Sequence, residues 1–226
     1  MTYDNILYGR FISRPNRFVA RVELDGREEI CHVKNTSRLR ELLLPGAPVS
    51  VQKAANPARK TQYTLVAVQH GAQWVNLDST APNKLFGEWA VQSGYFGEIS
   101  LLRPETAYGK SRLDYYIEAG GRRIFVEVKG VTLVEEGIAR FPGAPTLRGV
   151  KHLQELGQCL GEGYEAMVAF VIKRNDVRGF APNDEMQPAF GAALRAAAAR
   201  RVQVLALDCE VEPARLKIRR FVDVLL

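Results

Sequence analysis

The segment RLDYYIEAGGRRIFVEVKG constrains the fold most, because two alternating stretches flank its Gly120-Gly121 pair. A Gly-Gly pair suits a two-residue hairpin loop in which both residues need a positive φ. With these residues as the loop, the register predicts Asp114 directly opposite Glu127 on one face. The other face is apolar and pairs Leu113 with Val128. The sequence therefore predicts a hairpin whose apolar face is buried and whose second face carries ionisable groups.

The polar face of this hairpin suits metal chemistry. Carboxylates opposed across two strands have Cβ atoms about 4.5–5.5 Å apart and repel each other. A divalent cation bound by Asp114 and Glu127 would remove that repulsion, and Mg²⁺ prefers such oxygen ligands. Lys129 projects from the same face and is predicted to position a water or to neutralise charge on a phosphate. The alternative is an ordinary solvated strand face with charges of both signs.

Composition narrows the class of protein. The chain has 226 residues, 46% of them hydrophobic and 25% charged, which is typical of globular domains. The sequence shows no signal-peptide pattern and no apolar run of membrane-helix length. Three scattered cysteines without a CxxC pair argue against a disulfide framework or a cysteine zinc site. We expect a cytoplasmic protein with no membrane association.

The charge distribution favours an anionic partner. The net charge is +6, and residues 1–80 hold 11 basic and 7 acidic side chains, against 20 and 18 in residues 81–226. A basic excess of this size fits nucleic acid, although many enzymes carry as much. A homodimer stays among the oligomeric states compatible with the sequence.

The N-terminal part, residues 1–80, is predicted to be a small barrel of the OB type. Its short alternating segments are separated by turn residues such as Asp25-Gly26. A short helix is expected over 38–44, after the capping residues Asn35-Thr36-Ser37. The five expected strands are 17–24, 29–33, 49–53, 63–68 and 74–77.

The C-terminal part, residues 81–226, is predicted to be an α/β domain. Strand patterns alternate with helical ones, and two of the apolar runs are of the kind buried on both faces of a sheet. The expected helices are 84–92, 147–160 and 188–201. The expected strands are 112–118, 124–129, 166–172 and 202–207.

Asp114, followed after twelve residues by Glu127-Val128-Lys129, resembles the PD-(D/E)xK nuclease motif, with Leu113 where that motif often has proline. More specifically, the chain from about residue 10 onward resembles the SfsA (sugar fermentation stimulation protein) family. The blocks that carry this resemblance are RFVA (17–20), LDG (24–26), NT (35–36), LLPG (43–46), NPARK (56–60), NKL (83–85), SRLD (111–114), FVEVK (125–129), VTL (131–133), ARFP (139–142), RG (148–149) and KHL (151–153).

The resemblance implies two domains, an N-terminal OB-type β-barrel and a C-terminal restriction-endonuclease-like α/β domain with a divalent-metal site. The family is described as DNA-binding and is linked to regulation of sugar-utilisation genes, and only through this resemblance is DNA expected rather than RNA. The implied catalytic residues are Asp114, Glu127 and Lys129. Mg²⁺ or Mn²⁺ is expected on Asp114, Glu127 and the Val128 carbonyl, with Glu88 of the preceding helix as a further carboxylate or else a solvated helix residue.

Basic residues of both domains are candidates for the phosphate backbone. In helix 147–160, Arg148, Lys151 and His152 share a face, and a solvated amphipathic face is the alternative. The remaining nucleic-acid candidates are Arg10, Arg17, Arg59, Lys60 and Arg112.

Two functions follow from these features. The first is DNA binding with metal-dependent phosphodiester hydrolysis. The second is a non-catalytic DNA-binding regulator of sugar-utilisation genes that retains the nuclease fold. The sequence lacks the glycine-rich and GxSxG motifs of ATPases, dinucleotide enzymes and serine hydrolases.

Overall fold

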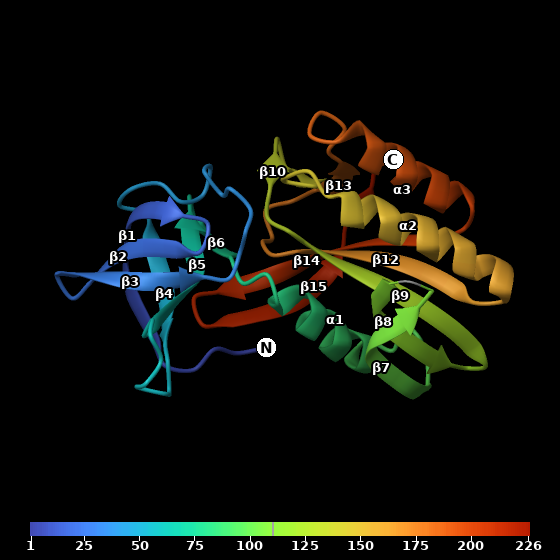
Figure 1. The fold of residues 1–226 in the computed structure, drawn as a ribbon, viewed down its shortest axis with the longest axis horizontal. Coiled ribbons are helices and arrows are strands. Elements are labelled where there is room, and N and C mark those ends of the chain that lie inside the picture. Colours follow the sequence, from blue (N-terminus) through green and yellow to red (C-terminus); the bar gives the residue numbers. More distant parts are fainter. Residues whose placement is uncertain (110) are drawn as a thin grey trace.

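The computed structural model describes residues 1–109 and 111–226, which form an N-terminal barrel and a C-terminal α/β domain (Figure 1). The predicted fold class is confirmed. The barrel sheet has the order β3-β2-β1-β4-β5-β6 and closes through pairing of β3 with β5. Its strands are β1 (Ile6–Asn16), β2 (Val19–Leu24), β3 (Arg27–Val33), β4 (Pro48–Lys53), β5 (Tyr63–His70) and β6 (Gln73–Asn76).

Strand β1 is missing from the predicted set. Its register with β2 shifts between Phe11 and Ser13 and again between Ser13 and Asn16. These irregularities break the two-residue alternation on which strand prediction depends. The Asp25-Gly26 turn between β2 and β3 is confirmed, with both residues at positive φ.

The helix predicted over 38–44 is wrong. Leu39 has φ +53°, a left-handed conformation that a right-handed helix excludes. The guanidinium of Arg14 instead binds the carbonyls of this loop, including those of Asn35, Ser37 and Arg38. Loop leucines of this segment fill the barrel core.

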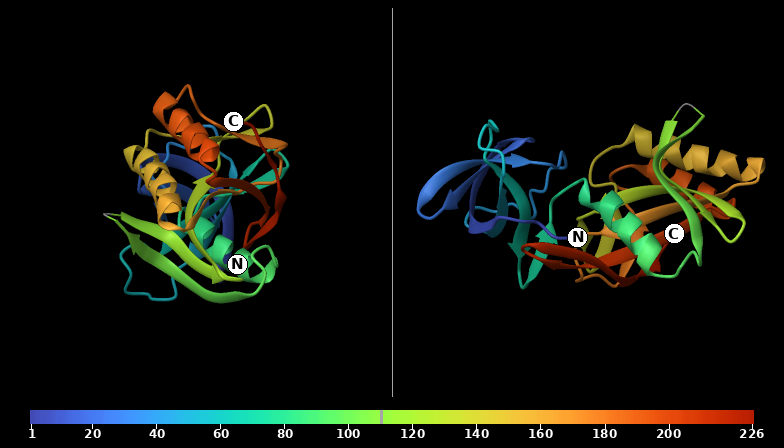
Figure 2. Two further views of the ribbon diagram at one scale, coloured as in Figure 1. Left: turned by 90° about the vertical axis from the view of Figure 1, so that its right-hand side faces the viewer. Right: turned by 90° about the horizontal axis from the view of Figure 1, so that it is seen from below.

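The C-terminal domain is built on a six-stranded sheet of order β15-β14-β12-β9-β8-β7. Strands β9, β12 and β14 are parallel, and β12 is buried along nearly its whole length. Helix α1 (Ala81–Gln92) packs on one face, and α2 (Leu147–Cys159) and α3 (Pro188–Ala199) pack on the other (Figure 2). The strands are β7 (Ile99–Tyr108), β8 (Ser111–Ala119), β9 (Arg122–Val131), β12 (Glu165–Ile172), β14 (Gln203–Glu212) and β15 (Arg215–Phe221).

A small second sheet of order β10-β11-β13-β16 lies beside α3. None of its strands was predicted, because each has only two to four residues. Its strands are β10 (Val134–Glu135), β11 (Ile138–Phe141), β13 (Gly179–Pro182) and β16 (Asp223–Val224), and a 3₁₀ turn η1 (Leu160–Glu162) follows α2. Among the described residues, no helix has the length and apolarity needed to cross a bilayer.

The two domains meet at a buried polar junction around Asp78. Its carboxylate accepts hydrogen bonds from Thr80, and Lys34 Nζ lies 3.3 Å from Oδ2. Lys173, which follows β12, is buried and donates to the Asp78 carbonyl at 2.9 Å. The Lys173 carbonyl in turn accepts from the Asn76 amide of β6. The junction therefore ties the end of the barrel to the central sheet.

The first residues of the chain add a second connection. Thr2 forms a β-bridge with Arg215, and Tyr3 donates its amide to the Ala214 carbonyl. The amide of Leu216 donates to the Met1 carbonyl. These contacts attach the N-terminal segment to the β14–β15 hairpin, which is distant from it in the sequence.

Because Lys173 is buried, we expect the free energy of unfolding to depend on pH. Burial lowers the pKa of Lys173 to about 8. Between that pH and the ordinary lysine pKa, the unfolded chain holds the proton and the folded chain does not, so the free energy of unfolding rises with pH. We expect wild type to gain about 2 kcal/mol more than Lys173→Met between roughly pH 7 and pH 10. Chemical denaturation across this range measures the difference, and parallel curves for the two proteins would contradict it.

Candidate metal site

The hairpin forms as predicted near its turn and departs from prediction near Asp114. Gly120 and Gly121 have φ +56° and +78°, and the ladder runs in the predicted register from Ala119–Arg122 to Tyr115–Val126. The regular pairing ends there, so Asp114 does not lie opposite Glu127 in the ladder.

The strand faces also differ from prediction beyond Tyr115. Leu113 packs in the cluster under α2, whereas Tyr115 and Val128 pack in the cluster under α1. The predicted Leu113–Val128 pair is therefore wrong. On the neighbouring strand β7, Glu105 has φ +51°, and pairing with β8 resumes at Thr106–Leu113. Asp114 lies at this interruption, between the paired residues Leu113 and Tyr115.

Asp114 is held by two donors. Its Oδ2 accepts the backbone amide of Val128 at 2.7 Å, which replaces a ladder hydrogen bond. Its Oδ1 accepts the side-chain amide of Asn83 at 2.6 Å. Asn83 lies in the first turn of α1, and its carbonyl accepts the hydroxyl of Tyr115. Sequence reasoning missed this role of Asn83, whose only signal is an amide residue placed directly after Pro82 at a helix start.

Glu127 lies on the α2 face of β9 and is 3% exposed. Its Oε1 is bound by both Lys129 Nζ and His152 Nδ1. Its Oε2 is buried and has no hydrogen-bond partner among the described residues. Buried polar atoms without partners are rare in native proteins and call for an explanation such as a bound ion.

The electrostatics of the two carboxyl groups differ. Burial and the nearby charge of Glu127 raise the pKa of Asp114, against the hydrogen bonds from Val128 and Asn83. Burial also works to raise the pKa of Glu127, but the hydrogen bonds from His152 and Lys129 and the positive charge of Lys129 outweigh it and lower that pKa. Glu127 is thus held in its ionised form, and the two carboxylates are close enough to repel each other.

The structure assigns His152 a different task from the predicted phosphate contact. Its side chain is 3% exposed and lies between Glu127 and Arg148. Arg148 Nε donates to His152 Nε2 at 3.2 Å, so the ring proton lies on Nδ1 and is donated to Glu127. A buried ring with both nitrogens engaged positions Glu127 and offers phosphate no free donor.

Three of the predicted phosphate-binding residues lie beside Glu127 and His152. Arg112, Arg148 and Lys151 line a hollow of about 690 Å³ between α2 and the β7–β8 hairpin, which we call the cationic hollow. All three are exposed, and the described lining of the hollow includes no carboxylate. The hollow thus presents positive charge next to Glu127 and His152.

Glu88 does not join the carboxylates of Asp114 and Glu127. Its side chain pairs with the amino group of Met1 at 3.0 Å and lines a separate hollow with Trp89, Lys217 and Arg219. Glu88 lies on α1 five residues beyond Asn83, and Asn83 is the α1 residue that contacts Asp114.

The predicted basic residues of the barrel are dispersed. Arg10 donates to the Gly46 carbonyl at 3.0 Å, and Arg17 lies over the Phe18 ring at 4.8 Å. Arg59 and Lys60 are exposed in the loop between β4 and β5.

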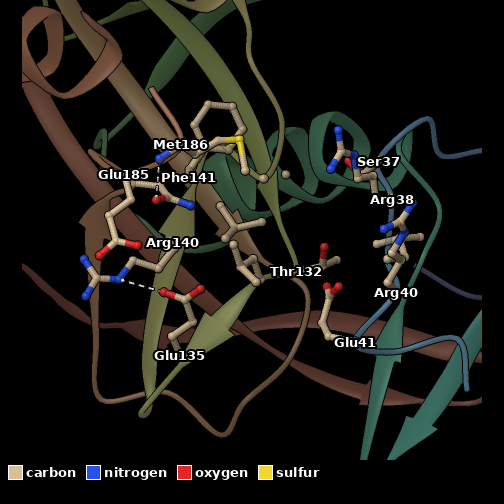
Figure 3. Close-up of a pocket in the computed structure, with 16 residues that line it drawn as sticks. Ser37, Arg38, Arg40, Glu41, Thr132, Glu135, Arg140, Phe141, Glu185 and Met186 are labelled. Atoms are coloured by element: carbon tan, nitrogen blue, oxygen red, sulfur yellow. Dashed lines mark hydrogen bonds and ion pairs between the residues drawn. The ribbon is translucent and has the colours of Figure 1, made fainter. Parts of the chain in front are cut away.

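A cleft of about 480 Å³ separates the barrel loop from the C-terminal domain and begins at Gly130 and Thr132, just past Lys129 on β9 (Figure 3). Its lining carries both signs of charge. The basic members are Arg38, Arg40 and Arg140, and the acidic members are Glu41, Glu135 and Glu185. Because these charges balance, the cationic hollow is the better match for phosphate.

The donor set around Asp114 and Glu127 fits a hard divalent cation. Within residues 1–109 and 111–226, no three His, Cys, Asp or Glu side chains form a metal-binding group. Mg²⁺ commonly takes one or two carboxylates and completes its shell with waters and phosphate oxygens. The unpartnered Oε2 of Glu127 matches that mode of binding.

Family models and relatives of known sequence align with both domains of the chain. A family model described as "Sugar fermentation stimulation protein RE domain" matches residues 80–215, and one described as "SfsA N-terminal OB domain" matches residues 12–77. A "Sugar fermentation stimulation protein homolog" of Desulfitobacterium hafniense (strain Y51) is 54% identical over 226 residues, covering 100% of this chain and 99% of the relative. The homolog of Clostridium beijerinckii is 50% identical and covers 100% of both chains. The solved structure of Pyrococcus furiosus SfsA in complex with Ca²⁺ superposes with a TM-score of 0.90 at 28% identity, covering 100% of this chain and 98% of that one.

Proposed function

This chain belongs to the sugar fermentation stimulation protein (SfsA) family, and we propose that it is a cation-dependent nuclease that binds DNA. The observation that carries the proposal is the buried, unpartnered Oε2 of Glu127 near the second carboxylate, the partly buried Asp114. The division into domains 1–80 and 81–226 is part of the proposal, as is a cytoplasmic location, which three buried free thiols support.

The proposed cation is Mg²⁺ or Mn²⁺, held by Asp114, Glu127 Oε2 and the Val128 carbonyl. The Ca²⁺ bound by the Pyrococcus furiosus relative supports a site for a hard divalent cation. When bound, the cation would activate a water and stabilise charge on a phosphate oxygen.

The chain's own residues prepare this site. His152 and Lys129 hold Glu127 through Oε1 and leave Oε2 for the cation. The Lys129 side chain is 15% exposed, so its ammonium group can orient a water or a phosphate oxygen at the surface of the site. Arg112, Arg148 and Lys151 would bind the phosphate backbone through the cationic hollow.

A cleavage assay with labelled single- and double-stranded DNA and RNA tests the proposal. We expect Mg²⁺ or Mn²⁺ to support cleavage by wild type and EDTA to stop it. Asp114→Ala and Lys129→Ala should abolish cleavage, because each removes a group of the reaction site. Glu98→Gln, at an exposed carboxylate before β7, is the matched control and should cleave as wild type does.

The regulator of sugar-utilisation genes is the second candidate. It is favoured by the engagement of Glu88 with Met1 and by the small number of carboxylates at the site. If DNA shifts in gels but stays intact at high enzyme excess with both cations, the regulator function replaces the nuclease.

A further inference from the structure

A second hollow adjoins the cationic one and differs from it in chemistry. Its volume is about 620 Å³, and the two share Ala107, Gly109 and Lys151. Its walls are aromatic, with Tyr108, Phe125 and Tyr164 in its lining, and we call it the aromatic hollow. Ligand pockets of proteins fall in this size range and combine apolar walls with a few placed polar groups.

The aromatic walls form a packed cluster. The rings of Tyr108 and Phe125 have centroids 5.1 Å apart, and those of Phe125 and Tyr164 are 4.9 Å apart. Phe125 is 4% exposed, whereas both tyrosines are partly exposed. Arg123 lies over the Tyr164 ring at 4.5 Å and Glu162 accepts the Tyr108 hydroxyl at 2.9 Å, so both rings are fixed in place. Fixed, partly exposed aromatic rings are the surfaces on which nucleobases stack.

One polar group in the aromatic hollow lacks a partner. Glu155 of α2 is 8% exposed, and its Oε2 is buried with no hydrogen-bond partner among the described residues. Its Oε1 lies 3.6 Å from Lys151 Nζ, whereas Oε2 has no donor in the described part of the chain. A carboxylate oxygen accepts hydrogen bonds and donates none.

The two hollows carry opposite charges, and each suits a different part of a nucleotide. The aromatic hollow contains the carboxylates of Glu155 and Glu162, which would repel a phosphate. The cationic hollow contains Arg112 and Arg148, which attract one. Lys151 lies at the boundary of both. A nucleotide can thus place its phosphate on the cations and its base against the tyrosines.

We propose that the aromatic hollow binds one unpaired nucleobase of a single-stranded nucleic acid and that Glu155 selects bases with an exocyclic amino group. Such a group, as on cytosine N4, donates to a carboxylate. Uracil and thymine present a carbonyl oxygen at that position, which a carboxylate oxygen repels. A base within a duplex cannot stack on a protein ring, so the base must be unpaired. This inference deepens the proposed function and rests on it for the nucleic-acid partner.

Cytosine and uracil form the matched pair that tests the inference. Fluorescence anisotropy with labelled oligonucleotides of deoxycytidine or deoxyuridine, about eight nucleotides long, measures binding in EDTA, at low salt and mildly alkaline pH. We expect wild type and Glu98→Gln to bind deoxycytidine roughly tenfold more tightly, as for one hydrogen bond to a charged group. In Glu155→Gln the preference should fall to within about twofold, because the amide can also donate to uracil.

An unmodified protein gives an independent measurement that does not require the variant to fold. Oligonucleotides of N4,N4-dimethylcytosine lack the amino hydrogens and should bind wild type as weakly as deoxyuridine. Equal binding of cytosine and uracil by wild type, or a preference that survives in a folded Glu155→Gln, would overturn the inference.

The two proposals fail separately. Binding in EDTA needs no cation, so a lost cytosine preference alongside intact cleavage would remove only the base-reading role of Glu155. An intact preference without any cleavage would remove only the nuclease.

Discussion

Glu127→Gln is expected to lower cation-dependent cleavage by roughly a thousandfold or more while leaving the protein folded. The substitution changes one atom of the side chain and can keep its contacts with Lys129 and His152. A glutamine can keep its carbonyl oxygen at the Oε1 position, where Lys129 and His152 donate. Its amide nitrogen then occupies the position of Oε2, the atom proposed to bind the cation. The variant thus loses a ligand and a negative charge with little change in shape.

Two measurements check this result. Calorimetry with Mn²⁺ should show binding by wild type and by Glu98→Gln, and a greatly weakened signal for Glu127→Gln. Thermal unfolding in EDTA should show that the variant folds. If Glu127→Gln binds Mn²⁺ and cleaves at the wild-type rate, Glu127 is not a ligand, and the nuclease would need another site.

Asp78→Ala is expected to reduce the free energy of unfolding by about 3–5 kcal/mol. The substitution removes the acceptor of the Thr80 hydrogen bonds and the carboxylate beside Lys34. It also leaves the buried ammonium group of Lys173 without its nearby negative charge, although the backbone carbonyl of Asp78 stays. An uncompensated buried charge is among the most destabilising of single changes.

Urea denaturation checks this prediction with two companion variants. Asp4→Ala, at an exposed aspartate of the N-terminal segment, should change the free energy of unfolding by less than about 0.5 kcal/mol. Adding Lys173→Met to Asp78→Ala should restore part of the loss, because the buried charge is then gone. Independent, additive effects of the two substitutions would show that Lys173 and Asp78 do not interact across the junction.

The sequence predicted those parts of the site that depend on local chain geometry. The Gly120-Gly121 turn determines the register of the strands beside it, and that register holds as far as Tyr115–Val126. Beyond Tyr115 the strand responds to distant groups. Asn83, 31 residues earlier in the chain, binds Asp114, and Glu105 on the next strand adopts a positive φ. Neither effect can be predicted from the alternation of apolar and polar residues in the hairpin.

The role of His152 shows a second kind of limit. Helical spacing correctly placed Arg148 and His152 one turn apart on α2. It did not reveal which of these side chains turns inward, because that depends on the packing of α2 against β9. Once α2 lies on the sheet, Glu127 provides a buried carboxylate, and the imidazole satisfies it. In the barrel, similarly, the closing pair β3–β5 joins segments that are about 30 residues apart and carry no common signal.

The bridge between Thr2 and Arg215 has a consequence for biosynthesis. The barrel has all its strands once the ribosome has made Asn76, whereas Arg215, the partner of Thr2, is made much later. At roughly 5–20 residues per second, the intervening synthesis takes on the order of 10–30 s. During that time the barrel can fold and Tyr3 can pack against it, but Thr2 has no strand to pair with. The N-terminal segment can therefore pair with the C-terminal domain only after Arg215 has been made, later than Lys173, which joins the two domains at Asp78.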